Sequence, residues 1–595
     1  MYGRRGRAVG ASVATVLALV LAGCGNSSNG SSTGAASTPK QGGTLKLLGA
    51  SDVDHLDTVS AYYTTSYTLE RAFTRQLFSY PATADVSKAI NPVADVATVI
   101  PTTANGGISA DGKTYTIHLR SGVRWNTQPA RAVTAGDFVR GLQRLCNPVS
   151  PVGAPGYYTN TIVGMQQFCD GFAKVPGNAK AMADYIDSHQ ISGVTAPNDT
   201  TIVFKLMKPA SDFLNILALP FASAAPVEYL RYVPDDATFR QHTLSDGPYE
   251  ITKYSANKEI DLDRNSAWEQ TADPIRHQYV DQIQIVQGQT DPGTVQQQIQ
   301  AGTADMEWDT VVPTANIPAL RASNDSRLGI FPALSTNPFL IFNFQSPNNS
   351  GALKKLQVRQ ALEYAIDKVA IGQIYGGPDL NTPLDQVIPP GNVGYQPFNL
   401  YPTPDHRGDP AKCKQMLAQA GYPNGLKLNY VYRNAGNHPA VTQSVQADLK
   451  KCGVTVKLIP QTPADFYGKY LTNPSGARQG LWDIAAPGWV PDWYGNNGRA
   501  IVEPLFDGRT YGPNSVDYGD YNSSEVNSLI DRALSEATAD KAAPLWHQAD
   551  MQIMKDAAFI PFQTQKTAIY HSSRVQNTIF FPFSQNYDLT QVWLQ

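Results

Sequence analysis

The stretch DPAKCKQMLAQAGYPNGLKLNYVYRNAGNHPAVTQSVQADLKKCGVTVKLI, residues 409–459, decides the fold class. It begins with the pattern of a helix that ends at Gly421, a residue suited to the left-handed turn after a helix. Two apolar runs, 426–432 and 454–459, predict strands, and a helix over 439–452 connects them. Strand and helix therefore alternate, which predicts a lobe of the α/β class.

The next informative stretch is LWDIAAPGWVPDWYGNN, residues 481–497, a run that prolines and glycines interrupt. It places Trp489, Trp493 and Tyr494 close to the carboxylate of Asp492. Aromatic faces supply large, stiff apolar surfaces, and a carboxylate among them can anchor a cation. Because loops on a rigid scaffold often carry binding groups, we interpret this run as a site for a ligand with an amine. The alternative is that the aromatic side chains belong to the core and that the aspartate caps a turn.

Length and composition limit the class of protein. A chain of 595 residues is too long for one core, so we expect about two or three domains. Hydrophobic residues make up 42% of the chain and charged residues 16%, which is typical of a globular protein. The net charge of -3 gives no excess of basic residues, so we expect no nucleic-acid partner.

One motif suggests nucleotide binding, but its context argues against it. GISADGKT, residues 107–114, fits the P-loop pattern, which requires a helix directly after it. Here Tyr115, Ile117 and Leu119 alternate with polar residues and predict a strand instead. The chain also has no H-E-x-x-H pattern and no close Cys/His pair. We therefore expect no enzymatic activity, no catalytic residues and no cofactor.

The N-terminus has the features of an export signal. Arginines within residues 1–7 precede an apolar run over 9–22, which is too short to span a bilayer as a stable helix. The run ends in Leu-Ala-Gly-Cys, which resembles the lipobox of bacterial lipoproteins and makes Cys24 the acylated residue. We predict a signal peptide over 1–23, a flexible Ser/Gly-rich tether over 24–42 and a lipid anchor in the cell membrane, facing outside or the periplasm. An ordinary signal peptide with a chance cysteine is the alternative.

Four cysteines follow the predicted lipid anchor: Cys146, Cys169, Cys413 and Cys452. An even number in an exported chain favours two disulfides, and the short separations favour Cys146 with Cys169 and Cys413 with Cys452. Other pairings and free buried thiols stay open. No histidine cluster accompanies these cysteines, so we expect no metal site.

Several segments, in this order along the chain, resemble one known family. They are LRSGVRWNTQPARAVTAGDFVRGLQRL (119–145), SDGPYEITKY (245–254), IQAGTADM (299–306), VRQALEYAIDKVAI (358–371) and DPAKCKQMLAQAGYPNG (409–425). Together they resemble the extracellular solute-binding proteins of family 5, the oligopeptide- and dipeptide-binding lipoproteins of ABC importers. The ordered set is far more specific than any one segment.

The resemblance implies an α/β fold of two lobes, the periplasmic-binding-protein-like fold of type II, cluster C, with an extra inserted subdomain in the first lobe. The implied boundaries are 43–83, 199–286 and 559–595 for the first lobe, 84–198 for the inserted subdomain and 287–558 for the second lobe. The hinge is expected near Gln287 and Phe559, where the chain would cross between lobes.

The resemblance also implies roles for individual residues. GWVPDWY, residues 488–494, is similar to the family segment whose aspartate binds the α-amino group of a peptide. Asp492 is therefore the expected amine anchor, and Trp489, Trp493 and Tyr494 are the expected walls. Tyr249, in the Gly-Pro-Tyr turn, is a further candidate at the cleft, although a structural turn would explain it equally well.

The implied function is the capture of extracellular peptides by hinge closure, and their delivery to the permease and ATPase subunits of an importer. We expect a monomer. Two alternatives stay open: the same fold with a nickel chelate, haem or an oligosaccharide as ligand, or a peptide-signal receptor without uptake. Tyr157 and Tyr158 are interpreted as residues of a loop that packs against the insertion, and a position at the border of the cleft is the alternative.

Overall fold

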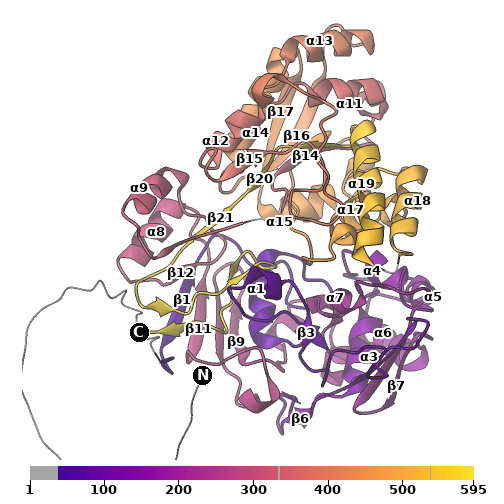
Figure 1. The fold of residues 1–595 in the computed structure, drawn as a ribbon, viewed down its shortest axis with the longest axis vertical. Helices are drawn as coiled ribbons and strands as arrows, with labels where there is room; N and C mark the ends of the chain where they lie inside the picture. Colours follow the sequence, from indigo (N-terminus) through magenta and orange to yellow (C-terminus); the bar gives the residue numbers. More distant parts are fainter. Residues whose placement is uncertain (1–37, 333–334, 537) are drawn as a thin grey trace, which may run out of the picture. The chain divides into compact units, whose positions relative to one another are not determined.

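The computed structural model describes residues 38–332, 335–536 and 538–595 (Figure 1). The fold described below is that of the compact unit Lys40–Gln595. The predicted signal peptide and Cys24 lie outside the described residues. Within the described part of the chain, no helix combines the length and the apolar character that a membrane span requires.

A five-stranded sheet forms the core of the first lobe. In spatial order its strands are β12 (Met306–Glu307), β1 (Thr44–Leu48), β11 (Gln282–Val286), β10 (Glu259–Arg264) and β9 (Tyr249–Ser255). β1 runs parallel to β11 and β12, and β9 and β10 complete the sheet in antiparallel pairs. Leu45, Leu47, Ile283 and Ile285 are all fully buried in its core, and α1 (Thr64–Phe73) packs against β9.

A second five-stranded sheet forms the core of the other lobe. Its strands are β17 (Thr455–Gln461), β16 (Lys427–Arg433), β18 (Ile484–Ala485), β14 (Phe339–Phe342) and β19 (Phe559–Pro561). β16 and β17 are parallel, and α14 (His438–Lys451) connects them, as the orange ribbons of Figure 1 show. This unit and α13 (Pro410–Gln419) confirm the alternation predicted for residues 409–459.

Residues between the strands of the first sheet form a separate three-stranded antiparallel sheet of β4 (Thr114–His118), β8 (Thr201–Lys205) and β7 (Val194–Asn198). β4 begins at Thr114, the last residue of GISADGKT, so a strand stands where a P-loop requires a helix. α3 (Ala135–Arg144) begins with a capping box, in which the Asp137 carboxylate accepts a hydrogen bond from the Thr134 backbone N–H at 3.0 Å. Disulfides join Cys146 to Cys169 here and Cys413 to Cys452 in the second lobe, the pairs that the spacing favours.

Strand pairing places the points where the chain crosses between the lobes later than the sequence analysis predicts. β12 pairs with β1, and β13 (Leu328–Phe331) pairs with β21 (Thr567–Tyr570), so the chain stays with the first lobe well beyond the expected crossing near Gln287. It enters the second sheet only at β14. β19 still belongs to that sheet, so the return also comes later than Phe559. β8 pairs with β4 and β7, beyond the predicted end of the insertion at 198.

Candidate functional site

The loop after β18 carries the aromatic and acidic residues that the sequence singles out. β18 lies between β16 and β14 in the second sheet, so this loop leaves from a fixed position. The Trp489 N–H donates to the Thr336 carbonyl at 2.8 Å, which ties the loop to the segment before β14. A side chain at Gly488 would overlap Asn337, so glycine permits this close approach. The loop is therefore held rather than loosely attached.

Asp492 is a buried carboxylate that contacts residues of the first lobe. Its side chain is only 7% exposed, and the hydroxyls of Tyr62 and Tyr157 donate to its Oδ2 at 2.9 and 2.6 Å. Among the described residues, no arginine, lysine or histidine forms an ion pair with it. Burial raises the pKa of Asp492 to about 7, although the two tyrosine hydrogen bonds lower it. A buried carboxylate without a basic partner is suited to receive a cation.

Aromatic rings surround this carboxylate from both lobes. Tyr62 stacks on Phe221, with ring centroids 5.1 Å apart, and lies 5.8 Å from Trp489. Tyr157 lies 4.9 Å from Trp493. Two of the predicted wall residues thus lie beside rings that bind Asp492 directly. Tyr157, interpreted from sequence as a packing residue, is a partner of the candidate anchor.

The structure places the other two candidates differently. Tyr494 is buried and packs against Phe583, with centroids 5.4 Å apart, on a C-terminal segment that also lies near the carboxylate. Tyr249 lies in β9, is 0% exposed, and donates its hydroxyl to the Val280 carbonyl at 3.3 Å. It belongs to the core of the first sheet and has no contact with Asp492, so the structural alternative describes it better.

Beside the carboxylate is a small space that we call the Asp492 cavity, with a volume of about 30 Å³. Its lining includes Tyr67, Arg71, Tyr80, Asp492, Phe581 and Phe583. Apart from Asp492, the lining comes from α1, the segment directly after it, residues 218–220 and the C-terminal loop. The candidate anchor therefore faces a space that is built mostly by the first lobe.

Arg433 is a second charged residue without a matching partner, and the sequence interpretation missed it. It ends β16, and its guanidinium lies 5.5 Å from the ring centroids of both Phe466 and Tyr467. Its Nε is buried and unpaired, and no carboxylate of the described chain forms an ion pair with it. Ligands of open α/β sheets bind at the carboxyl ends of strands, and this position was the signal available in the sequence.

Arg433 and Asp492 belong to the same region of the molecule. The pKa of Tyr518 is raised well above its usual value, chiefly by burial, and the charges of both Arg433 and Asp492 also act on it. Tyr63, from the first lobe, packs on Tyr467 with centroids 5.6 Å apart. The two unmatched charges, one negative and one positive, thus flank one aromatic zone between the lobes.

A further set of contacts joins the lobes at α17 (Gly498–Phe506). Arg499 donates to the Gly156 carbonyl at 2.9 Å and lies 3.7 Å from Asp212, both in the first lobe. Arg499 also pairs with Glu503, which accepts a hydrogen bond from Asn160 at 2.8 Å. These charges are satisfied within the protein, so they support contact between the lobes rather than ligand binding.

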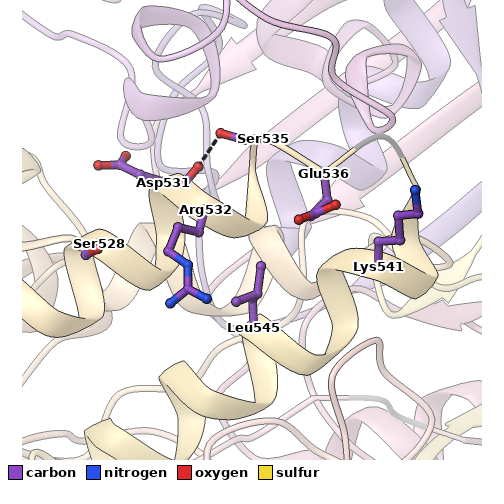
Figure 2. Close-up of a pocket in the computed structure, with 7 residues that line it drawn as sticks. All are labelled: Ser528, Asp531, Arg532, Ser535, Glu536, Lys541 and Leu545. Atoms are coloured by element: carbon purple, nitrogen blue, oxygen red, sulfur yellow. Dashed lines mark hydrogen bonds between the residues drawn. The ribbon is translucent and has the colours of Figure 1, made fainter.

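A larger surface cavity of about 550 Å³ lies along α18 (Ser524–Ala533) and α19 (Ala539–Lys555), as Figure 2 shows. Its lining residues are Ser528, Asp531, Arg532, Ser535, Glu536, Lys541 and Leu545. They carry charges of both signs and no aromatic side chain, and Asp531 is already paired with Arg509 at 2.8 Å. This cavity lacks the features that make the Asp492 region a candidate site.

Comparison with known proteins supports one family. The sequence model described as bacterial extracellular solute-binding proteins, family 5 Middle, matches residues 98–508. Heme-binding protein A of Haemophilus influenzae is 26% identical over 493 residues, which cover 80% of each chain. The periplasmic oligopeptide-binding protein OppA of Escherichia coli is 25% identical over 470 residues, 78% of each chain. The structure of clavulanic acid biosynthesis oligopeptide binding protein 2 has a TM-score of 0.76 and 26% identity, covering 93% of this chain and 96% of that one.

Proposed function

The chain belongs to family 5 of the bacterial extracellular solute-binding proteins, and from this premise we propose that it captures peptides between its two lobes for an ABC importer. The observation that carries the proposal is the buried carboxylate of Asp492, which has two tyrosine partners and no basic partner within the described part of the chain. The amino end of a peptide supplies the missing positive charge. Trp489 and Trp493 then flank the bound end as apolar walls.

Arg433 supports a ligand with charge at both ends. A guanidinium that pairs with no carboxylate of the described residues offers charge-assisted hydrogen bonds to the carboxylate of a ligand. A short peptide is such a ligand, because its two ends carry opposite charges. The pair of unmatched charges therefore favours a peptide with free ends over a neutral ligand.

The ligand itself can be identified directly. The purified protein is denatured, and the released material is examined by mass spectrometry and absorbance. We expect masses of short peptides. A haem absorbance or a stoichiometric metal in the absence of peptide would contradict the proposal, and would favour the kind of ligand for which Heme-binding protein A is named.

The proposal includes a place in the cell. The acylated Cys24 anchors the protein in the membrane, the tether over 24–42 holds its folded part outside, and the protein acts as a monomer with permease and ATPase subunits. The support is the signal-like N-terminal sequence together with the extracellular family.

Replacing Cys24 by serine tests the anchor. The variant cannot be acylated at that position, so we expect it in the soluble or secreted fraction, whereas the unmodified protein stays with the membrane. Cell fractionation followed by immunoblotting measures the change. A Ser27→Ala variant, altered in the same segment, serves as the control, and membrane retention of Cys24→Ser would refute the anchor.

The titration of Asp492 predicts that acid favours closure of the ligand-free protein. An aspartate in water has a pKa of about 3.9, and burial between the lobes raises the pKa of Asp492 to about 7. Between these two pH values, Asp492 therefore takes up a proton when the lobes close. The favourable contribution of this protonation to closure is full below about pH 4 and is lost as the pH rises through about 7. The radius of gyration from X-ray scattering should be smaller at about pH 5 than at about pH 8. Asp492→Asn should remove this difference, and a radius that does not change with pH in the unmodified protein would contradict the argument.

A further inference from the structure

Three oxygen atoms that accept no hydrogen bond from the described residues belong to residues that line the Asp492 cavity. Oδ2 of Asp492 is occupied by Tyr62 and Tyr157, whereas no described residue donates to its Oδ1. Tyr67 and Tyr80 also line this cavity, and the hydroxyls of both are buried without a hydrogen-bond partner in the described chain. Buried polar groups are normally satisfied, so two unsatisfied hydroxyls beside a carboxylate indicate that a ligand supplies the donors.

Charge narrows the class of ligand. The cavity has two charged lining residues, Arg71 and Asp492. The guanidinium of Arg71 is paired with Asp588 at 3.0 Å and also donates to the Ser79 hydroxyl at 2.7 Å, so its charge is matched. The charge of Asp492 is the unmatched one, and it favours a cation.

Size narrows the class further. The volume of about 30 Å³ leaves room for a small group only. An ammonium group is such a group, whereas a guanidinium or a quaternary ammonium is much larger. Phe583 stacks on Tyr80 with centroids 4.0 Å apart, so the walls at this point are aromatic and close together.

We infer that Tyr67 and Tyr80 make the site specific for a primary ammonium group, whose three N–H donors meet Oδ1 of Asp492 and the two hydroxyl oxygens. The inference rests on the proposed function, since that ammonium is the amino end of the peptide. A peptide methylated on its first nitrogen has one donor fewer and brings an additional methyl group into this small cavity. One hydroxyl is then left unsatisfied.

The test uses the full-length protein and two tripeptide mixtures of the same sequences, one with free amino ends and one methylated at the first nitrogen. Mass spectrometry of the retained material measures capture. Hydrogen bonds to a charged group are strong enough to give a roughly 10- to 100-fold preference for the free amino end. In Tyr67→Phe and in Tyr80→Phe we expect this preference to fall at least about threefold.

Tyr158→Phe is the matched control, because Tyr158 is equally buried but donates its hydroxyl to the Ile216 carbonyl at 3.4 Å and does not line the cavity. The preference of the Tyr158→Phe variant for the free amino end should equal that of the unmodified protein. Equal capture of both mixtures by the unmodified protein would overturn the inference and leave the proposed function standing. If the unmodified protein captures neither peptide mixture, both the inference and the proposed function are overturned. A preference that stays full in both cavity variants would overturn the role of the tyrosines.

Discussion

Asp492→Asn lowers the affinity for a peptide with a free amino end by about 2 to 5 kcal/mol, the usual cost of removing one partner of a buried charge pair. The substitution keeps the size of the side chain and removes its negative charge. The ammonium of the peptide would then be buried without a counter-charge, which is strongly unfavourable. Titration calorimetry with one tightly bound peptide measures the loss.

Two controls separate this loss from a general defect. A peptide acetylated at its amino end has no ammonium, so Asp492→Asn should change its affinity little. Asp550 is a matched control residue, because burial also raises its pKa to about 7, but it accepts hydrogen bonds from Val387, Ile388 and Gln386 within the second lobe. Asp550→Asn should lower stability and leave the affinity of the folded protein unchanged. Equal affinity of the unmodified protein for free and acetylated peptides would exclude Asp492 as the amine anchor.

Local patterns in the sequence were sufficient for much of the fold. The alternation over 409–459 and the strand predicted from Tyr115, Ile117 and Leu119 depend on residues that are close in the chain, and the structure confirms both. The lobe crossings depend on strands that pair across long separations, such as β1 with β12 and β13 with β21. Periodicity within one segment carries no information about such partners, so the predicted crossings were misplaced.

For the candidate site, too, the sequence predicted what lies within one segment but not the partners from distant segments. Composition identified the loop with Asp492 and its tryptophans, but the two tyrosines that bind this carboxylate lie 430 and 335 residues away in the chain. Asp483 belongs to the same stretch, yet its carboxylate accepts a hydrogen bond from the Asn429 backbone N–H at 2.7 Å and serves the sheet. The stretch alone does not distinguish these two acids, because their surroundings come from other parts of the chain.

The same reasoning applies to Tyr249. The Gly-Pro-Tyr turn marks the start of a strand, and a sequence does not show which side of the sheet the tyrosine will face. In the structure it faces the core of the first sheet. Arg433 is the reverse case, since one arginine at the end of a strand is unremarkable until the structure shows that no carboxylate in the described ranges pairs with it.

Arg433→Gln gives the second large expected effect, a loss of about 2 to 5 kcal/mol in affinity for a peptide with a free carboxyl end. Glutamine can still donate a hydrogen bond, but it lacks the charge and the forked geometry that suit a carboxylate. Calorimetry with the same peptide in its free-acid and amidated forms measures the difference. The loss should be large for the acid and small for the amide.

Arg359 offers the matched control, because its guanidinium is buried but bonded to the backbone carbonyls of Leu353 and Asp556 in the second lobe. Arg359→Gln should affect stability and not the difference between acid and amide. If Arg433→Gln weakens both forms equally, Arg433 supports the packing of Phe466 and Tyr467 instead of binding a carboxylate. If the substitution changes the affinity for neither form, a residue other than Arg433 binds the carboxyl end of the peptide. A selective loss for the acid, together with the selective loss at Asp492 for the free amine, would fix the direction in which the peptide lies between the lobes.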